Sequence, residues 1–192
     1  FPIDTVYFYA QTDSYAEFSN FALYGVAMDG VWWPTVEHYF QAQKFLDPDH
    51  REKIRRAGRA KDAKTFGMTR QLPLRPDWEL VKDGIMFEAV RAKFRTHEKL
   101  ARLLLSTGKR LIVENAAMDA YWGCGPDGSG LNKLGNILMT VREELATIDA
   151  ALLTSRMPRA ADLVGVDDLD LDMLAAAAAI NNAERVHLVE RV

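Results

Sequence analysis

The segment at residues 35–44, TVEHYFQAQK, constrains this chain more than any other. Its pattern predicts one short helix, in which Glu37, Gln41 and Lys44 stand at i, i+4 and i+7 and therefore share a face. A lysine and a glutamate held among aromatic rings are typical of a pocket that adjusts the charge of an amine. The aromatic residues that crowd this part of the sequence are Phe18, Phe21, Trp32, Trp33, Tyr39, Phe40 and Phe45.

Lys44 is the candidate nucleophile of that face. A lysine amine attacks only when it is neutral, and desolvation by apolar neighbours lowers its pKa toward the neutral form. A nearby Glu37 would oppose that shift in pKa, although its carboxyl could act as a general acid or base. The alternative is a helix with one solvated face on which Glu37 and Lys44 never meet. The spacing leaves both interpretations open.

Length and charge limit the class of protein. The 192 residues fit one domain with an appendage, and the net charge of -3 argues against broad electrostatic binding of nucleic acid. A single cysteine, Cys124, allows no internal disulfide and predicts a reducing compartment, the cytoplasm. No apolar run approaches a bilayer span, so no membrane association is expected. The four histidines form no HExxH or Cys/His ligand pair, so neither a metal nor another cofactor is expected.

The remaining pattern predicts an α+β fold, a mainly helical single domain with a small antiparallel sheet over residues 1–150. Strands are expected at residues 5–9 and 111–113, and a hairpin at 22–33 turns at Asp29-Gly30. After residue 150 the composition becomes rich in aspartate and alanine, which predicts an acidic C-terminal extension, 151–192, with one helix near 171–181. Further helices are expected at residues 48–57, 60–66, 77–96, 97–106 and 132–148.

A glycine-rich loop at residues 116–130 is a second candidate for ligand binding. Its backbone N–H groups could approach a phosphate closely, Trp122 could stack on a base or a ribose, and Asp119 could bind ribose hydroxyls. The spacing matches neither GxGxxG nor GxxxxGK[ST], so a surface loop with a core tryptophan is the alternative. Asn132 stands where a helix N-cap would, and capping explains it more simply than ligand binding.

Residues 51–64 carry a local excess of lysine and arginine, with only Glu52 and Asp62 as acidic residues. Such a segment could hold the phosphates of a nucleotide or a nucleic acid. A solvated helix face is the simpler interpretation.

Several motifs together resemble the signature of the YbiA-like NADAR family, the NAD and ADP-ribose superfamily. The resemblance covers about residues 8–145 in order, and the tail lies outside it. The matching segments are FSNF at residues 18–21, WPTVEHYFQAQKF at 33–45, Ala63-Lys64 with Gly67, RPDW at 75–78, Asp119 with Tyr121-Trp122-Gly123, and Asn132 with Leu134-Gly135, Leu138-Met139 and Arg142.

The resemblance implies an N-glycosidase in a compact, mainly helical α+β domain. Members of the family act on phosphoribosylamino-pyrimidine intermediates of riboflavin synthesis or remove ADP-ribose from modified guanine bases. By resemblance, Lys44 is the catalytic nucleophile. We further expect Glu37 to shuttle protons and Asp119 to hold the ribose hydroxyls. The expected ligand-binding residues are Asn20, Phe21, Gln41, Trp122, Gly123 and Asn132.

The leading hypothesis is removal of ADP-ribose from guanine in DNA through a Schiff base on Lys44. A riboflavin-pathway N-glycosidase is the rival among enzymes. A non-catalytic ADP-ribose or NAD-binding module, and an interaction module that acts through its acidic tail, are the alternatives outside enzymes. The sequence predicts no oligomeric state.

Overall fold

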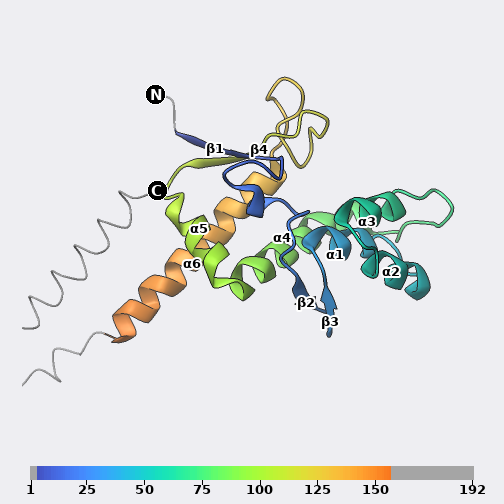
Figure 1. Cartoon of the computed structure of the whole chain (residues 1–192), viewed down its shortest axis with the longest axis horizontal. Coiled ribbons are helices and arrows are strands. Elements are labelled where there is room, and N and C mark those ends of the chain that lie inside the picture. The colour runs from blue at the N-terminus through green and yellow to red at the C-terminus, as the bar shows by residue number, and fades with distance from the viewer. Residues whose placement is uncertain (1–3, 157–192) are drawn as a thin grey trace, which may run out of the picture. The chain divides into compact units, whose positions relative to one another are not determined.

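The structure is a computed structural model that describes residues 4–156 (Figure 1). The chain divides into two compact units, Phe1–Ala146 and Thr147–Val192. The helix expected near residues 171–181 and most of the acidic extension lie outside the described residues. None of the helices within residues 4–156 combines the length and the apolar character that crossing a bilayer requires.

Two pairs of short strands form the β part of the fold. β2 (Val26–Met28) and β3 (Val31–Trp33) pair antiparallel, and β1 (Thr5–Phe8) pairs parallel with β4 (Leu111–Glu114). Asp29 and Gly30 join β2 to β3 with positive φ angles of 53° and 77°, as a type I′ turn requires. The predicted small antiparallel sheet and its turn are therefore confirmed, whereas the parallel pairing of β1 with β4 is an addition.

Helices make up most of the described chain, which confirms the predicted mainly helical α+β class. After a short 3-10 turn at Ala16–Phe18, the helices are α1 (Val36–Ala42), α2 (Pro48–Arg55), α3 (Ala60–Gly67), α4 (Trp78–Thr96), α5 (Glu98–Ser106) and α6 (Lys133–Arg156).

Polar caps fix where the first helices begin. The Thr35 hydroxyl accepts from the His38 backbone N–H at 3.3 Å, and the Asp47 carboxylate accepts from the His50 N–H at 2.6 Å, with Pro48 in the first turn of α2. The first helix is shorter than predicted. It ends at Ala42, so Lys44 lies in the turn that follows, where its N–H bonds the Gln41 carbonyl at 3.3 Å.

The core forms around α1, in which every residue is buried. This helix packs against α2, α3 and α4 (Figure 1), so its polar side chains lie between helices and away from water. The rings of Phe8, Phe18 and Phe94 connect β1 to α4 through edge contacts of 5.9 and 5.7 Å between centroids. A buried short helix thus carries Glu37 and Gln41 into the interior.

The expected role of Asn132 as a side-chain cap is wrong. Its Oδ1 accepts from the Glu114 N–H at 3.0 Å, and its Nδ2 donates to the Ile112 carbonyl at 2.8 Å. Asn132 therefore hydrogen-bonds the backbone of β4 just as a neighbouring strand would. Gly135 allows this close approach, since an added Cβ would lie 2.2 Å from the Ile112 carbonyl oxygen. The start of α6 is thus fixed against β4, and Glu114 at the end of that strand is held with it.

Candidate active site

Glu37 and Gln41 meet on the buried face of α1, as their spacing predicts. Gln41 Nε2 donates to Glu37 Oε1 at 2.7 Å, and only 5% of Glu37 is exposed. Burial raises the pKa of the Glu37 carboxyl above its ordinary value, although the Gln41 hydrogen bond and the charges of Lys64 and Lys44 oppose that rise. Desolvation is the largest of these effects, so the neutral acid is more populated than in an exposed glutamate.

Lys44 is half-buried beside that carboxyl. Its Nζ lies 5.9 Å from the ring centroids of both Phe40 and Trp78, and 3.5 Å from the carbonyl oxygen of Gly67. Burial lowers the pKa of the Lys44 amine below 10.5, and Glu37 is the first of the charges that oppose this shift. Because burial outweighs the attraction to Glu37, a larger fraction of the Lys44 amine is neutral and nucleophilic than in an exposed lysine.

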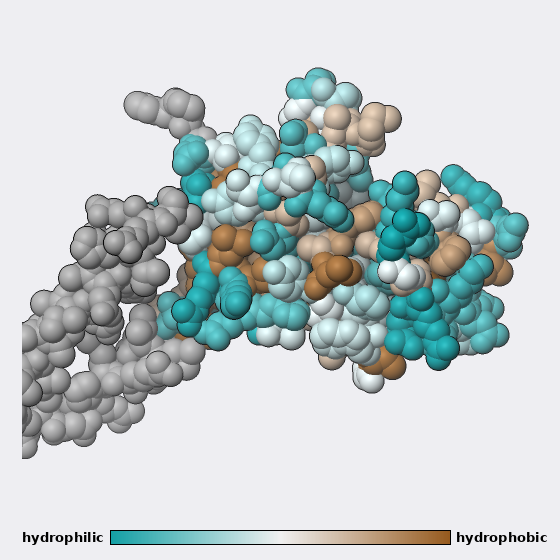
Figure 2. Space-filling model, in the orientation of Figure 1, coloured by the Kyte–Doolittle hydropathy of each residue, from teal (hydrophilic) through white to brown (hydrophobic). Residues whose placement is uncertain are grey.

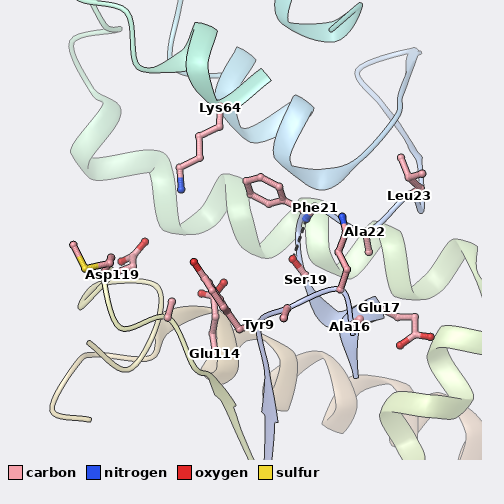
Figure 3. Close-up of a pocket in the computed structure, with 14 residues that line it drawn as sticks. Tyr9, Ala16, Glu17, Ser19, Phe21, Ala22, Leu23, Lys64, Glu114 and Asp119 are labelled. Carbon is pink, nitrogen blue, oxygen red and sulfur yellow. Dashed lines mark hydrogen bonds between the residues drawn. The ribbon is translucent and has the colours of Figure 1, made fainter. Parts of the chain in front are cut away.

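A pocket of about 590 Å³ is lined by Phe21, Lys64, Glu114 and Asp119 among others, whereas Lys44, Glu37 and Gln41 are not among its lining residues. Figure 3 shows Lys64 reaching from α3 toward the wall that carries Asp119, Glu114 and Tyr9. Lys64 Nζ also lies 5.7 Å from the centroid of the Phe21 ring, another lining residue. Among the described residues that line the pocket, Lys64 alone carries a positive charge. Three carboxyl groups, those of Glu17, Glu114 and Asp119, line the pocket together with the Lys64 amine.

Glu114 is the most perturbed carboxyl of the pocket wall. Burial raises its pKa to about 7, the negative charges of Asp119 and Glu37 add to the rise, and Lys64 opposes it. The pKa of Glu37 responds in turn to Lys64 and Asp119. The buried face of α1 and the wall of the pocket are therefore electrostatically one site.

Asp119 lines the pocket and also shapes the loop that follows it. Its Oδ1 accepts from the N–H groups of Tyr121 at 3.0 Å and Trp122 at 2.8 Å. One carboxylate oxygen therefore holds the turn, and the side chain still contributes to the pocket wall.

The glycine-rich loop does not present the expected row of free N–H groups. Cys124 N–H bonds the Glu114 carbonyl at 2.9 Å, Gly125 N–H bonds the Ala116 carbonyl at 3.2 Å, and Gly130 N–H bonds the Cys124 carbonyl at 2.7 Å. The interpretation of this loop as a phosphate cradle is wrong for these three groups, because their hydrogen-bonding capacity is used within the loop.

The structure separates the expected ligand-binding residues. Phe21 lines the pocket, and Gln41 lies beside Glu37. Asn20 is buried and its Nδ2 donates to Met86 Sδ at 3.2 Å, while Asn132 bonds β4. Trp122 packs edge-on against Phe40 at 5.3 Å between ring centroids. Gly123 is tightly packed, since an added Cβ would lie 2.7 Å from the Ala116 Cβ. The contacts described for these last four residues are all with other parts of the protein.

Sequence reasoning gave no role in the reaction to Glu114 or Lys64. In the sequence, Lys64 belongs to the basic segment and to a family motif. Glu114 directly follows the strand predicted at residues 111–113, and in the structure it is the last residue of β4. The signal for Glu114 was its position, because polar residues at the end of a strand, just before a loop, commonly border a site.

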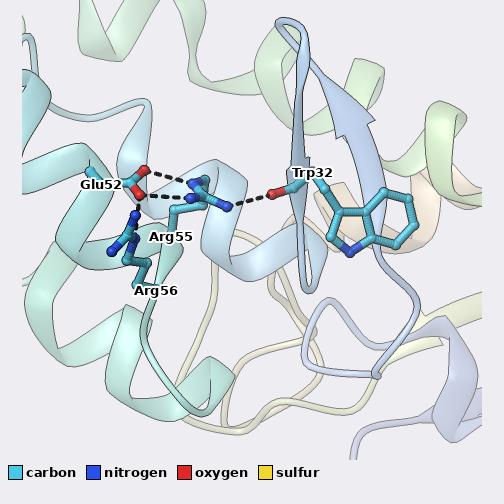
Figure 4. Close-up of polar contacts among 4 residues, drawn as sticks. All are labelled: Trp32, Glu52, Arg55 and Arg56. Atoms are coloured by element: carbon cyan, nitrogen blue, oxygen red, sulfur yellow. Dashed lines mark hydrogen bonds and ion pairs between the residues drawn. The ribbon is translucent and has the colours of Figure 1, made fainter.

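Three arginines of the basic segment at residues 51–64 form ion pairs within the segment. Arg55 and Arg56 both bind Glu52, Arg55 also donates to the Trp32 carbonyl at 3.2 Å (Figure 4), and Arg59 binds Asp62 at 2.9 Å. The region of α2 and α3 is mostly hydrophilic in Figure 2. This favours the interpretation as a solvated helix face. Within residues 4–156 no group of three or more His, Cys, Asp or Glu side chains is placed to hold a metal ion.

The fold and the site define a small α+β domain in which a shielded lysine lies near a buried glutamate, and that glutamate is coupled by charge to the wall of a ligand-sized pocket. The NADAR domain family matches residues 7–146, and the chain belongs to that family.

Similar proteins agree with this assignment. The chain is 51% identical over 139 residues to N-glycosidase YbiA of Escherichia coli (strain K12), covering 72% of this chain and 87% of that protein. The NMR structure of E. coli YbiA superposes with a TM-score of 0.72 at 47% identity and covers 78% of this chain and 89% of that one.

An N-glycosidase of Nostoc punctiforme is 45% identical over 147 residues, which cover 75% of this chain and 94% of that protein. The chloroplastic riboflavin biosynthesis protein PYRR of Zea mays is 39% identical over 160 residues, covering 75% of this chain and 26% of that protein. The family resemblance is confirmed, and a hydrolase of the N-glycosidase type is supported.

Proposed function

We propose that this chain removes ADP-ribose from modified guanine bases in DNA through a Schiff base on Lys44. The observation that carries the proposal is the environment of the Lys44 amine. It is shielded by Phe40 and Trp78 and lies near enough to Glu37 for charge coupling, and burial lowers its pKa. A shielded amine of this kind can attack the anomeric carbon of a ribose. Relatives named N-glycosidases support the type of bond that is broken.

The reaction proceeds in two halves. The neutral Lys44 amine forms a bond to the anomeric carbon as the bond from that carbon to the base nitrogen breaks, and the base leaves with a proton. The Lys44 nitrogen then loses a proton, and the ribose ring opens to a Schiff base as its ring oxygen is protonated. Water then adds to the same carbon, the carbon–lysine bond breaks, and free ADP-ribose leaves. Lys44 is regenerated, so the net change is hydrolysis.

The dimensions of the pocket and the position of Lys64 on its wall support the ADP-ribosyl substrate. A cavity of about 590 Å³ lies within the range of about 300–1,000 Å³ that is usual for small-molecule sites, and gives room for more than one sugar. Lys64 offers a positive charge for the diphosphate, and the rings of Tyr9 and Phe21 offer flat surfaces for a base. Three arginines of the basic segment are held by ion pairs within it, so the proposal places recognition on the modified nucleotide itself.

A second substrate class is favoured by one comparison. The similarity to a riboflavin biosynthesis protein of Zea mays points to phosphoribosylamino-pyrimidine intermediates. Such a ligand carries one phosphate on a ribose, so Lys64 and Asp119 could serve it as well. Both substrates require the same attack by Lys44.

Direct comparison of the two substrates tests the proposal. The full chain is incubated with an oligonucleotide that carries one ADP-ribosylated guanine, or with the phosphoribosylamino-pyrimidine, and products are quantified by mass spectrometry. We expect kcat/KM to be at least about tenfold higher for the oligonucleotide, and Lys44→Met to abolish turnover. Turnover of the pyrimidine alone would assign the second function. ADP-ribose binding by calorimetry, with neither substrate turned over, would indicate a non-catalytic module.

A further inference from the structure

We infer that Glu114 is the catalytic residue that gives a proton to the departing base and later takes one from the attacking water. This inference rests on the proposed function and deepens it, because it assigns the proton transfer to the pocket wall. Glu37, the acid–base candidate from sequence, is deeply buried on α1 beside Gln41.

Access to the pocket separates the two glutamates. Glu114 lines the cavity together with Asp119, Tyr9 and Lys64 (Figure 3), whereas Glu37 is not a lining residue. The departing base and the incoming water must both pass through space that is open to a ligand. A carboxyl group that lines this space can exchange protons with both of them, and Glu114 lines it.

The backbone of Glu114 is fixed independently of its side chain. Its N–H donates to Asn132 Oδ1 at 3.0 Å, and its carbonyl accepts from Ala116 N–H at 2.8 Å and Cys124 N–H at 2.9 Å. The residue also ends β4, which pairs with β1. A carboxyl group on such an anchored position can be held at one place in the pocket, as acid–base chemistry requires.

Charged groups from three parts of the fold act on Glu114. Asp119 comes from the loop, Glu37 from α1 and Lys64 from α3, while Tyr9 follows β1. Burial together with Asp119 and Glu37 outweighs Lys64, so the pKa of Glu114 rises to about 7. Near neutral pH both of its forms are populated, which suits a group that first donates and then accepts.

The proton balance follows from this state. Protonated Glu114 transfers its proton to the base nitrogen as the bond between that nitrogen and the anomeric carbon breaks, leaving the Glu114 carboxylate. In the second half the carboxylate takes a proton from water as the water oxygen bonds to the anomeric carbon. Glu114 is then protonated again for the next turnover, and no oxidant or reductant is needed.

The test compares Glu114→Gln with the wild type at single turnover. The amide keeps the shape of the side chain but cannot supply the proton, so guanine release from the oligonucleotide should slow by about 10²–10⁴-fold. The wild-type rate of this step should fall as pH rises through about 7, and the variant should lose that limb. The matched control is Glu98→Gln, an exposed α5 residue paired with Arg102, which should retain the wild-type rate.

A better leaving group provides a readout that a structural role would not change. The 4-nitrophenyl glycoside of ADP-ribose releases a stable phenolate that needs no proton. On this probe Glu114→Gln should release nitrophenolate within about fivefold of the wild-type rate, although its rate on guanine is lost. Equal losses on both substrates, or no loss on guanine, would overturn the inference.

Glu114→Asp keeps the test decisive if the glutamine variant does not fold. The shorter side chain of aspartate should restore part of the rate of guanine release and shift the pH-dependent fall in rate that lies near pH 7. An unchanged pH dependence would exclude Glu114 as its source.

Failure of the proposed function can be distinguished from failure of the Glu114 inference. In that case the wild type would release no guanine and would not be trapped by borohydride at Lys44. Failure of the Glu114 inference alone would leave both properties intact.

Discussion

At the scale of single residues, the candidate site depends on which effect dominates the charge of each group. Lys44 is drawn toward its charged form by Glu37 and away from it by burial and by Lys64, and burial is the largest of these effects. Each unit of pKa corresponds to about 1.4 kcal/mol between the two protonation states. A lysine in open water would have no such penalty, so burial is what makes the neutral amine available.

Replacing Lys64 tests this balance. In Lys64→Met, we expect the affinity for ADP-ribose to fall by about tenfold, since a charge-assisted contact contributes about 1.5–3 kcal/mol. Because Lys64 lowers the pKa of Lys44, its removal should also move the ascending limb of the rate profile to higher pH. Calorimetry and pH–rate profiles measure both effects. Lys61→Met, an exposed change on α3, is the control. Equal affinities and unchanged profiles in the two variants would refute the role.

At the scale of secondary-structure elements, local chemistry predicted most of the fold. The cap at Thr35, the Asp47-Pro48 start and the Asp29-Gly30 turn each specify their element through nearby atoms. The parallel pairing of β1 with β4 was not predictable in this way, because it joins segments far apart in sequence. Asn132 was misinterpreted for the same reason, since its partners lie on β4.

The candidate site also combines contacts that local sequence predicts with contacts that depend on tertiary packing. The Glu37–Gln41 contact follows from the helical period and was predictable. The convergence of Lys64 from α3 with Glu114 from β4 depends on tertiary packing, which single-sequence patterns do not encode. Local spacing therefore specified the α1 side of the site, and the opposite wall required the structure.

The contact between α1 and α3 depends on Gly67. An added Cβ there would lie 2.0 Å from Gln41 Oε1 and 2.8 Å from Gln41 Cβ, and Gln41 is buried. Gly67→Ala should therefore destabilise the fold by about 1–3 kcal/mol through overpacking, and displace the carbonyl near Lys44 Nζ. Thermal unfolding and single-turnover rates measure this. Gly58→Ala, where a Cβ meets nothing within 4 Å, should change little, and equal stabilities of the two variants would contradict the packing argument.

Lys93 connects α4 to the segment that forms part of the pocket wall. Only 1% of it is exposed, and its Nζ donates to the carbonyls of Glu17 and Ser19. Burial lowers its pKa from 10.5 to about 7. Between about pH 7 and 10.5 the unfolded chain therefore binds more protons than the folded chain does. The free energy of unfolding gains a contribution from Lys93 that increases as pH rises through this window.

Lys93→Met should remove that rise and leave two carbonyl groups without their donor, at about 1–3 kcal/mol each. The measurement is urea unfolding of both proteins from pH 6.5 to 9.5. We expect the difference in the free energy of unfolding between wild type and variant to widen as pH increases. A constant difference would show that Lys93 keeps an ordinary pKa.

At the scale of the whole molecule, the family match and the site lie in the same part of the chain. Residues 7–146 match the NADAR domain, and the buried residues of α6 that join the core, Leu134, Leu138 and Val141, come before Ala146. The proposed catalytic groups all lie between Glu37 and Asp119. We therefore assign the activity to this region and keep the role of the acidic extension as a separate question.

Shortening the chain after Arg156 tests that assignment. We expect the shortened protein to keep the melting temperature within about 2 °C and the turnover of the modified oligonucleotide within about twofold, because every described core and site residue is kept. Differential scanning calorimetry and the same turnover assay measure these properties. Loss of turnover with an unchanged melting temperature would mean that the removed residues contribute to the reaction.

The most direct test of the central claim is borohydride trapping on Lys44. Full-length protein is mixed with the ADP-ribosylated oligonucleotide and reduced with borohydride, and the tryptic peptides are sequenced by mass spectrometry. The account predicts an ADP-ribosyl group joined to Lys44 through a stable secondary amine, in wild type but not in Lys44→Met. Turnover without any trapped adduct at Lys44, or turnover that survives in Lys44→Met, would contradict it.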